Sequence, residues 1–148
     1  MMSRSKPRQL SADAFLAIVR TAEALQRGAV ELFRDYDLSP AQYNVLRILR
    51  GAGSAGATCS EVAGSLIQHD PDVTRLLDRL DTRGLIERSR DATDRRIVRT
   101  KITKAGTALL AELDEPVASL HARQFGHVSD KRLGELVALL GETRAGNS

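Results

Sequence analysis

The chain has 148 residues, which is enough for one domain with a sizeable core and an extension. Hydrophobic residues make up 42% of the chain and aromatic residues only 3%, a composition that favours a helical core and argues against the aromatic platforms of single-strand nucleic-acid binders. The net charge is +3. No apolar run approaches the roughly 18 residues of a membrane span, and the first residues lack a signal-peptide pattern. We therefore expect a cytoplasmic protein that does not enter a membrane.

The N-terminal part of the chain predicts a tail followed by a helix. Residues 1–9 are polar and basic, which is typical of a flexible tail, and an arm that contacts DNA or a partner subunit is the alternative. Apolar residues recur at helical spacing over residues 10–36, and this pattern predicts one long helix. Gly28 weakens the middle of that helix without being expected to break it.

Two further helices are predicted before residue 70. Ser39 is suited to cap a helix that ends near Arg50, and Gln42 is placed to complete a capping box. The glycine-rich segment 51–58 predicts a flexible connection. A short helix over residues 60–66 and a turn over 67–70 then lead into the next element, which together form a helix-turn-helix.

The segment DPDVTRLLDRLDTRG predicts the second helix of this motif, from about Pro71 to Arg83. Asp70 can cap its start, and Gly84 suits the residue just past its end. One face of the helix is apolar, with Val73, Leu76, Leu77 and Leu80 at spacings of three and four. The opposite face carries residue types that can contact base edges or phosphates, and we expect DNA contacts from Asp72, Thr74, Arg75, Asp78 and Arg79. For Asp72, stabilisation of the positive helix end is the alternative role.

The next segment predicts a basic β-hairpin. Strand-like patterns cover residues 85–89 and 96–102, and residues 91–94 have turn chemistry. Between Arg88 and Lys104 there are seven basic residues and two acids, a balance of +5, so the remainder of the chain is slightly acidic. A basic hairpin beside an exposed helix suits the phosphate backbone of DNA.

Two helices complete the chain. Thr103 is suited to cap the first, in which Pro116 should produce a kink or an interruption because proline lacks a backbone donor. Ser129 is suited to cap the last helix. The helix-turn-helix and the hairpin together span about 70 residues, which is too few to cover the apolar faces of the first and last helices. We therefore expect these faces to pack against another partner.

Four segments resemble the MarR family of winged helix-turn-helix transcription regulators. They are LSPAQYNVLRIL (38–49), SEVAGSL (60–66), DVTRLLDRLDTRGLIER (72–88) and DRRIVRTKITKAG (94–106), and together they cover about a third of the chain. The resemblance implies a mainly α fold, a winged helix-turn-helix with a two-stranded β wing, and N- and C-terminal helices that form a dimerisation region. The expected limits are a tail over 1–9, a dimerisation helix over 10–36, the DNA-binding region over 37–104, and C-terminal dimerisation helices over 105–148.

The same resemblance implies a function and its partners. We expect a homodimer that binds double-stranded DNA at a near-palindromic operator, acting as a repressor that responds to a small anionic or aromatic effector. Two recognition helices related by a two-fold axis would meet successive major grooves about 34 Å apart. The effector would lie between the dimerisation helices and the DNA-binding region. Candidate contacts there are Phe33, Tyr36 and Tyr43, and the alternative role of these three side chains is packing in the core.

The wing supplies further candidate DNA contacts. Asp94 and Arg96 are two residues apart and therefore point to the same side of an extended strand, so the carboxylate can hold the guanidinium in a pose suited to the minor groove. MarR-like wings use that pairing. Arg90 and Arg95 of the same wing are further candidate DNA contacts. We expect Arg95 to contact a phosphate or an internal carboxylate. Thr58 and Ser60, near a helix start, are candidate phosphate donors.

Other function classes find less support in the sequence. Cys59 is the single cysteine, and its place beside a helix start makes redox sensing an alternative to a bystander role. A winged helix that docks another protein is a second alternative, although such a module has no need for the concentrated positive charge. No catalytic motif, cofactor-binding loop or metal-ligand spacing is present, so we expect neither an enzyme nor a cofactor or metal.

Overall fold

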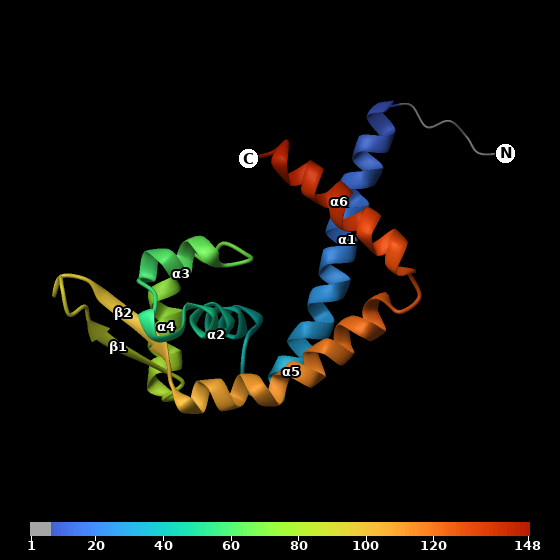
Figure 1. Cartoon of the computed structure of the whole chain (residues 1–148). Helices are drawn as coiled ribbons and strands as arrows, with labels where there is room; N and C mark the ends of the chain where they lie inside the picture. The colour runs from blue at the N-terminus through green and yellow to red at the C-terminus, as the bar shows by residue number, and fades with distance from the viewer. Residues whose placement is uncertain (1–6) are drawn as a thin grey trace.

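The computed structural model describes residues 7–148, so residues 1–6 of the predicted tail lie outside the described part. Residues 7–9, which were predicted to belong to the tail, form the start of the first helix, and that helix ends at Arg34 instead of residue 36. The chain forms an elongated molecule in which a winged lobe lies at one end and an arm of long helices at the other (Figure 1). The elements in chain order are α1 (Pro7–Arg34), α2 (Pro40–Ala52), a short 3-10 turn η1 (Gly53–Ala55), α3 (Cys59–Ser65), α4 (Val73–Thr82), β1 (Ile86–Arg90), β2 (Val98–Ile102), α5 (Lys104–Phe125) and α6 (Asp130–Ala145). This mainly helical architecture with a two-stranded wing confirms the predicted fold class.

Local signals set most helix starts as predicted. Ser39 caps α2, and its side chain and that of Gln42 exchange hydrogen bonds with each other's backbone N–H groups at 3.1 and 2.9 Å. Thr103 and Ser129 cap α5 and α6 in the same way, each accepting from a backbone N–H three residues on. Such caps satisfy N–H groups that have no partner inside the helix. The long first helix also forms without a break at Gly28.

Pro116 does not interrupt α5, which continues as one helix from Lys104 to Phe125. The helix changes direction along its length, as Figure 1 shows, and this fits the kink that was one of the two predicted outcomes. The first half of α5 places Leu110 and Leu113 in the core of the lobe, and Gln124 near its end donates to the Leu25 carbonyl of α1 at 3.0 Å. Thus α5 belongs to both the lobe and the arm.

The hairpin is antiparallel, with Ile86 opposite Ile102 and Arg90 opposite Val98. A third short segment extends this sheet, because Ala57 forms an isolated bridge with Thr100 and exchanges hydrogen bonds of 2.8 and 2.9 Å with it. The segment 51–58, predicted as a flexible connection, is therefore ordered by η1 and by this bridge. Gly56 is required there because its φ is +64° and a Cβ would lie 2.6 Å from the Thr100 carbonyl oxygen.

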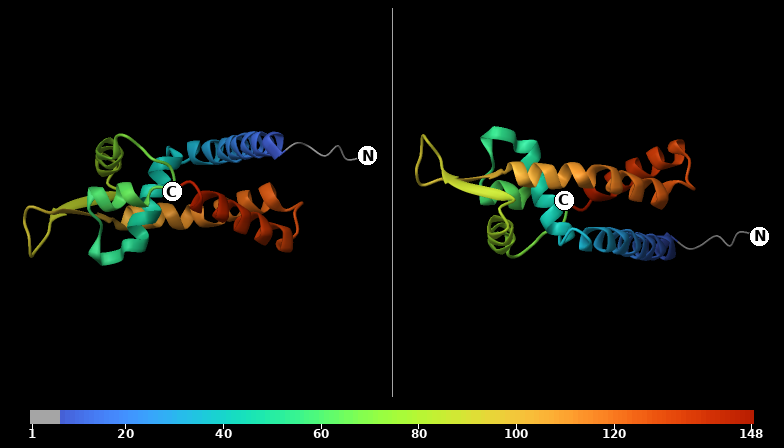
Figure 2. Two further views of the ribbon diagram at one scale, coloured as in Figure 1. Left: turned by 90° about the horizontal axis from the view of Figure 1, so that it is seen from above. Right: turned by 90° about the horizontal axis from the view of Figure 1, so that it is seen from below.

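One apolar core holds the lobe together. Val45, Leu46, Leu49, Val62, Leu80, Leu110 and Leu113 are fully buried within it. The arm has no comparable core: α6 contains no buried residue, and α1 exposes Leu10, Phe15, Leu16, Ile18, Val19 and Val30. α1 and α6 cross in the view of Figure 1, but the views of Figure 2 place them at different levels. No helix of the described residues has the length and apolar character that a membrane span needs.

Candidate nucleic-acid interface

The recognition helix, α4, begins two residues later than the sequence predicted. Asp72 is its cap, and the Asp72 carboxylate accepts a hydrogen bond from the Arg75 backbone N–H at 3.0 Å. The prediction that Asp70 caps the helix with Pro71 in its first turn was wrong, because Asp70 instead accepts from the Asp72 N–H at 2.8 Å and both residues precede the helix. The structure thus gives Asp72 a role at the helix end, where its negative charge opposes the positive helix dipole.

The two faces of α4 differ as expected from their spacing. Val73, Leu77 and Leu80 are buried, and Leu76 is half-buried against the same core. The exposed face carries the predicted contacts Thr74, Arg75, Asp78 and Arg79. This arrangement presents a hydroxyl, two guanidinium groups and a carboxylate on a helix whose other side is fixed by packing.

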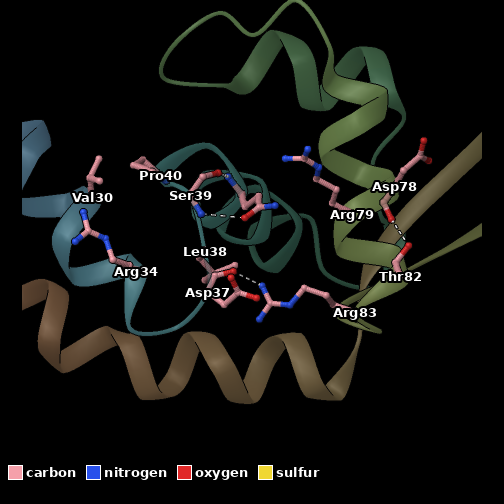
Figure 3. A pocket seen from close by; sticks show the side chains of 11 residues that line it. Val30, Arg34, Asp37, Leu38, Ser39, Pro40, Asp78, Arg79, Thr82 and Arg83 are labelled. Carbon is pink, nitrogen blue, oxygen red and sulfur yellow. Dashed lines mark hydrogen bonds between the residues drawn. The ribbon is translucent and has the colours of Figure 1, made fainter.

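Asp78 and Arg79 extend to different sides of α4 (Figure 3). Asp78 forms an ion pair with Arg88 of β1 at 2.8 Å. Arg79 lines an open groove of about 710 Å³ between α4, the end of α1 and the start of α2. In the same groove Arg83 donates hydrogen bonds to the carbonyl oxygens of Asp37 and Tyr36, at 2.5 and 3.2 Å, and so ties the end of α4 to the loop that follows α1.

Arg88 joins the wing to the recognition helix, a role that the sequence did not reveal. Its guanidinium contacts Asp78 at 2.8 Å and Asp81 at 2.9 Å, and these hydrogen bonds raise the pKa of Arg88. The sequence contains this arginine and the two aspartates, but only the packing of β1 beside α4 brings their side chains together. These two ion pairs connect the wing to the recognition helix.

The wing tip has the predicted pairing of Asp94 with Arg96, but the predicted strand over 96–102 begins only at Val98, so both residues lie in the wing loop and not on an extended strand. The Asp94 carboxylate accepts from the Arg96 backbone N–H at 3.1 Å and from the guanidinium Nε and Nη2 at 3.1 and 3.0 Å. These hydrogen bonds lower the pKa of Asp94 and raise that of Arg96. Because the Arg96 side chain is 91% exposed, the guanidinium is held in one pose while it remains free to contact a partner.

Asp91 organises the wing loop, and it was absent from the predicted contacts. Its Oδ2 accepts from the Thr93 hydroxyl at 2.7 Å and from the backbone N–H groups of Thr93 and Asp94 at 3.1 and 3.0 Å, while Oδ1 accepts from Arg99 Nε at 3.0 Å. These hydrogen bonds, that of the Thr93 hydroxyl above all, lower the pKa of Asp91 strongly. Arg99 also lies 3.8 Å from Glu61, which connects the wing base to α3.

The remaining wing arginines lie at the surface. Arg90 and Arg95 are both exposed, and Arg90 Nη1 donates to the Arg95 carbonyl oxygen at 2.8 Å. Arg90, Arg99 and Lys101 line a recess of about 470 Å³ at the side of the wing. The structure therefore gathers the basic residues predicted from the sequence on one hairpin beside α4, as a phosphate backbone requires.

The start of α3 holds the other predicted polar contacts. The Thr58 hydroxyl accepts from the Glu61 N–H at 3.1 Å, and the Glu61 carboxylate accepts from the Thr58 N–H at 2.9 Å, so Thr58 is a helix cap. Ser60 is exposed beside it. Cys59 is also exposed, and its Sγ lies 3.9 Å from the Thr74 hydroxyl of the recognition helix.

A cavity of about 430 Å³ lies between α1, α2, α5 and the loop after α3. Phe33 and Tyr43, two of the three predicted ligand contacts, line it and stack on each other with ring centroids 4.3 Å apart. Burial raises the pKa of Tyr43. Tyr36 is not among the lining residues, whereas Arg47 and His121, which sequence reasoning missed, are. The described residues hold no group of three or more His, Cys, Asp or Glu side chains able to bind a metal.

Comparison with known proteins agrees with this geometry. The sequence profile of the MarR family matches residues 38–98. The uncharacterised HTH-type transcriptional regulator YpoP of Bacillus subtilis is 30% identical over 116 residues, which cover 78% of this chain and 81% of YpoP.

Solved structures extend the likeness over nearly the full length. A MarR transcription factor from Planctomyces limnophilus is 38% identical, with a TM-score of 0.70 and coverage of 95% of this chain and 98% of that one. A cysteine mutant of MarR from E. coli, solved in complex with operator DNA, is 26% identical, with a TM-score of 0.81 and coverage of 94% and 99%. On this evidence of sequence and fold, the chain belongs to the MarR family of transcription regulators, and its winged helix is a DNA-binding unit.

Proposed function

We propose that the protein is a homodimeric, sequence-specific repressor that binds a near-palindromic operator in the cytoplasm and blocks transcription there. The observation that carries the proposal is the pairing of a basic recognition surface with an uncovered apolar arm. Nine large apolar side chains are exposed on α1 and α6, and Phe15 and Val137 are 65% and 67% exposed. A second copy of the arm is the partner that the family resemblance favours for this face.

A dimer of this kind would read two half-sites. Related by a two-fold axis, two copies of α4 would enter successive major grooves about 34 Å apart. Thr74 and Arg75 lie in the first turn of α4, where side chains reach base edges, and Arg96 would enter the minor groove. Arg79, Arg90, Arg95, Thr58 and Ser60 are proposed to contact the backbone, with Asp72, Asp78 and Asp94 holding the surface in shape.

DNA selection tests this proposal directly. The wild-type protein would be used to select duplexes from a random library, and the selected duplex would be titrated against its scrambled version over a series of salt concentrations. We expect a near-palindromic selected sequence, one dimer per duplex, and an affinity that falls steeply as salt rises because bound cations are released. Weak binding without sequence preference would contradict the proposal and would favour a wing that docks another protein.

We further propose that the cavity beside Phe33 and Tyr43 takes a small aromatic anion that weakens DNA binding. Its volume falls in the range of small-molecule sites, and its walls are mostly apolar with a few polar groups. Arg47 supplies a cation at the wall, which suits a carboxylate. Benzoate is the probe: calorimetry should detect binding to the wild-type protein and its loss in Arg47→Ala. Equal binding to both proteins would contradict a role for Arg47, and no binding would contradict the class of effector.

A further inference from the structure

The loop that precedes the recognition helix is held in place by few side chains. This linking loop, residues 66–72, spans the seven residues between α3 and α4, whereas a helix-turn-helix usually needs a turn of about three or four. Leu66 packs against the core of the lobe. Ile67, Gln68 and His69 are exposed, and Ile67 is 79% exposed, so side-chain burial does not hold the middle of the loop.

A hydrogen bond from a backbone N–H to a side chain holds the loop at its second residue. The Ile67 N–H donates to Oδ1 of Asn44 at 2.9 Å. Asn44 lies on α2 between Tyr43 and Val45, which are both buried. The acceptor therefore stands on a rigid element of the core, 23 positions away in the sequence.

The other end of the linking loop is continuous with the DNA-facing turn of α4. The Asp72 N–H donates to Asp70 at 2.8 Å, and the Arg75 N–H donates to Asp72 at 3.0 Å. These hydrogen bonds set where α4 begins, and the first turn carries Thr74 and Arg75. A displacement of the loop at Ile67 would therefore change the path of the chain into the part of α4 that faces DNA.

The same residues form one wall of the cavity. Asn44, Leu66, Ile67 and Gln68 all line it, together with groups from α1 and α5. Asn44 thus lines the cavity, and its carboxamide oxygen at the same time holds the loop that leads to the recognition helix.

We propose that Asn44 is a positioning residue for DNA binding, which couples the wall of the cavity to the start of the recognition helix through the Ile67 N–H. The inference rests on the proposed function, because it concerns how the same protein regulates its contact with DNA. It assigns to Asn44 a role that its neighbours on the cavity wall do not share. Gln68, for example, lines the cavity from the loop itself without being the acceptor for Ile67.

Three variants test the role of the acceptor oxygen. Asn44→Ala removes it, Asn44→Asp retains it, and Gln68→Ala is the matched control on the same cavity wall. The readouts are amide hydrogen exchange at Ile67 in the DNA-free protein, affinity for the DNA that the wild-type protein selects, and melting temperature. Arg96→Ala is measured in the same titration as a marker of DNA binding by the wing.

We expect Asn44→Ala to exchange the Ile67 amide about tenfold faster and to bind the selected DNA about fivefold to tenfold more weakly, at an unchanged melting temperature. Asn44→Asp and Gln68→Ala should behave as the wild type. Unchanged DNA affinity in Asn44→Ala beside a weakened Arg96→Ala would overturn the inference and leave the proposed function intact. An Asn44→Asp variant as weak as Asn44→Ala would also overturn it. A wild-type protein without sequence preference would instead overturn the proposed function and the inference together.

Discussion

The winged lobe and the arm of this chain bury their apolar side chains to very different extents. In the lobe, α2, α3, α4, the wing and the first half of α5 enclose a core whose central residues are fully buried. In the arm, α1 and α6 leave nine large apolar side chains exposed. The difference teaches that the lobe is complete within one chain, whereas the arm needs a second surface to remove its apolar side chains from water.

A core truncation in the lobe should have the largest effect. Leu110 is fully buried, so Leu110→Ala is expected to lower the free energy of unfolding by about 2–5 kcal/mol through lost burial and a residual cavity. Val137→Ala on α6, where the side chain is 67% exposed, is the control. Urea denaturation at a protein concentration low enough to favour monomers gives the comparison. A similar loss for both variants would mean that the arm is as well packed as the lobe.

A charge on the apolar face of the arm should break the proposed dimer. Val19 is 49% exposed on α1, and Val19→Asp is expected to raise the dimer dissociation constant about a hundredfold, because an unpaired carboxylate would be buried at the interface. Thr21→Asp places the same charge on another side of α1. Analytical ultracentrifugation measures both. If both variants remain dimeric, the partner surface does not include this face of α1.

The loss of one wing contact should have a smaller effect. Arg96→Ala is expected to weaken binding to the selected DNA about tenfold and to leave the melting temperature unchanged, because the side chain is 91% exposed. Arg95→Ala should weaken binding less and to a similar degree on all sequences, as loss of a phosphate contact does. Fluorescence anisotropy with selected and scrambled duplexes separates the two. Wild-type affinity in Arg96→Ala would refute the minor-groove role.

Acidic pH should have the smallest effect, and in the wing it should act through Asp91 and Asp94. The pKa values of Asp91 and Asp94 are lowered from 3.8 by their hydrogen bonds, so their contribution to wing stability is fully present above pH 3.8 and is lost as the pH falls through the lower folded values. Carbon NMR titration of the two carboxyl groups should therefore give midpoints below 3.8. In Asp91→Asn, amide exchange in the loop 91–97 should be faster at every pH. Titration midpoints near 3.8 would mean that these hydrogen bonds do not hold the wing loop in solution.

The parts of this molecule that local sequence decides were predicted well. The caps at Ser39, Thr103 and Ser129 join residues three positions apart, so their geometry follows from the first turn of the helix. The Asp94–Arg96 pair joins residues two positions apart and was predicted correctly, although both residues lie in the wing loop and not on the strand from which the pairing was argued. The start of α4 was mispredicted because Asp70 and Asp72 are both good caps. Pro71 added to the error, since proline suits the first helical turn as well as the loop before it.

The contacts that depend on packing between elements were not predicted. The Arg88 contacts with Asp78 and Asp81 require the angle between β1 and α4, and the Asp91–Arg99 contact requires the register of the hairpin. The cavity is formed by four separate segments, so Arg47 carried no local sign of its place there. The predicted roles of the individual DNA-contacting residues and the domain limits stay predictions.

The continuity of α5 has a consequence for protein engineering. Its first half supplies Leu110 and Leu113 to the core of the lobe, and Gln124 near its end contacts α1. A chimera that takes the lobe of one relative and the arm of another needs one junction in the loop between α1 and α2, and a second junction inside the helix α5. A shift of one residue at the junction in α5 would rotate the transplanted lobe by about 100° about the helix axis. The number of residues around Pro116 would therefore determine the direction in which an exchanged lobe faces.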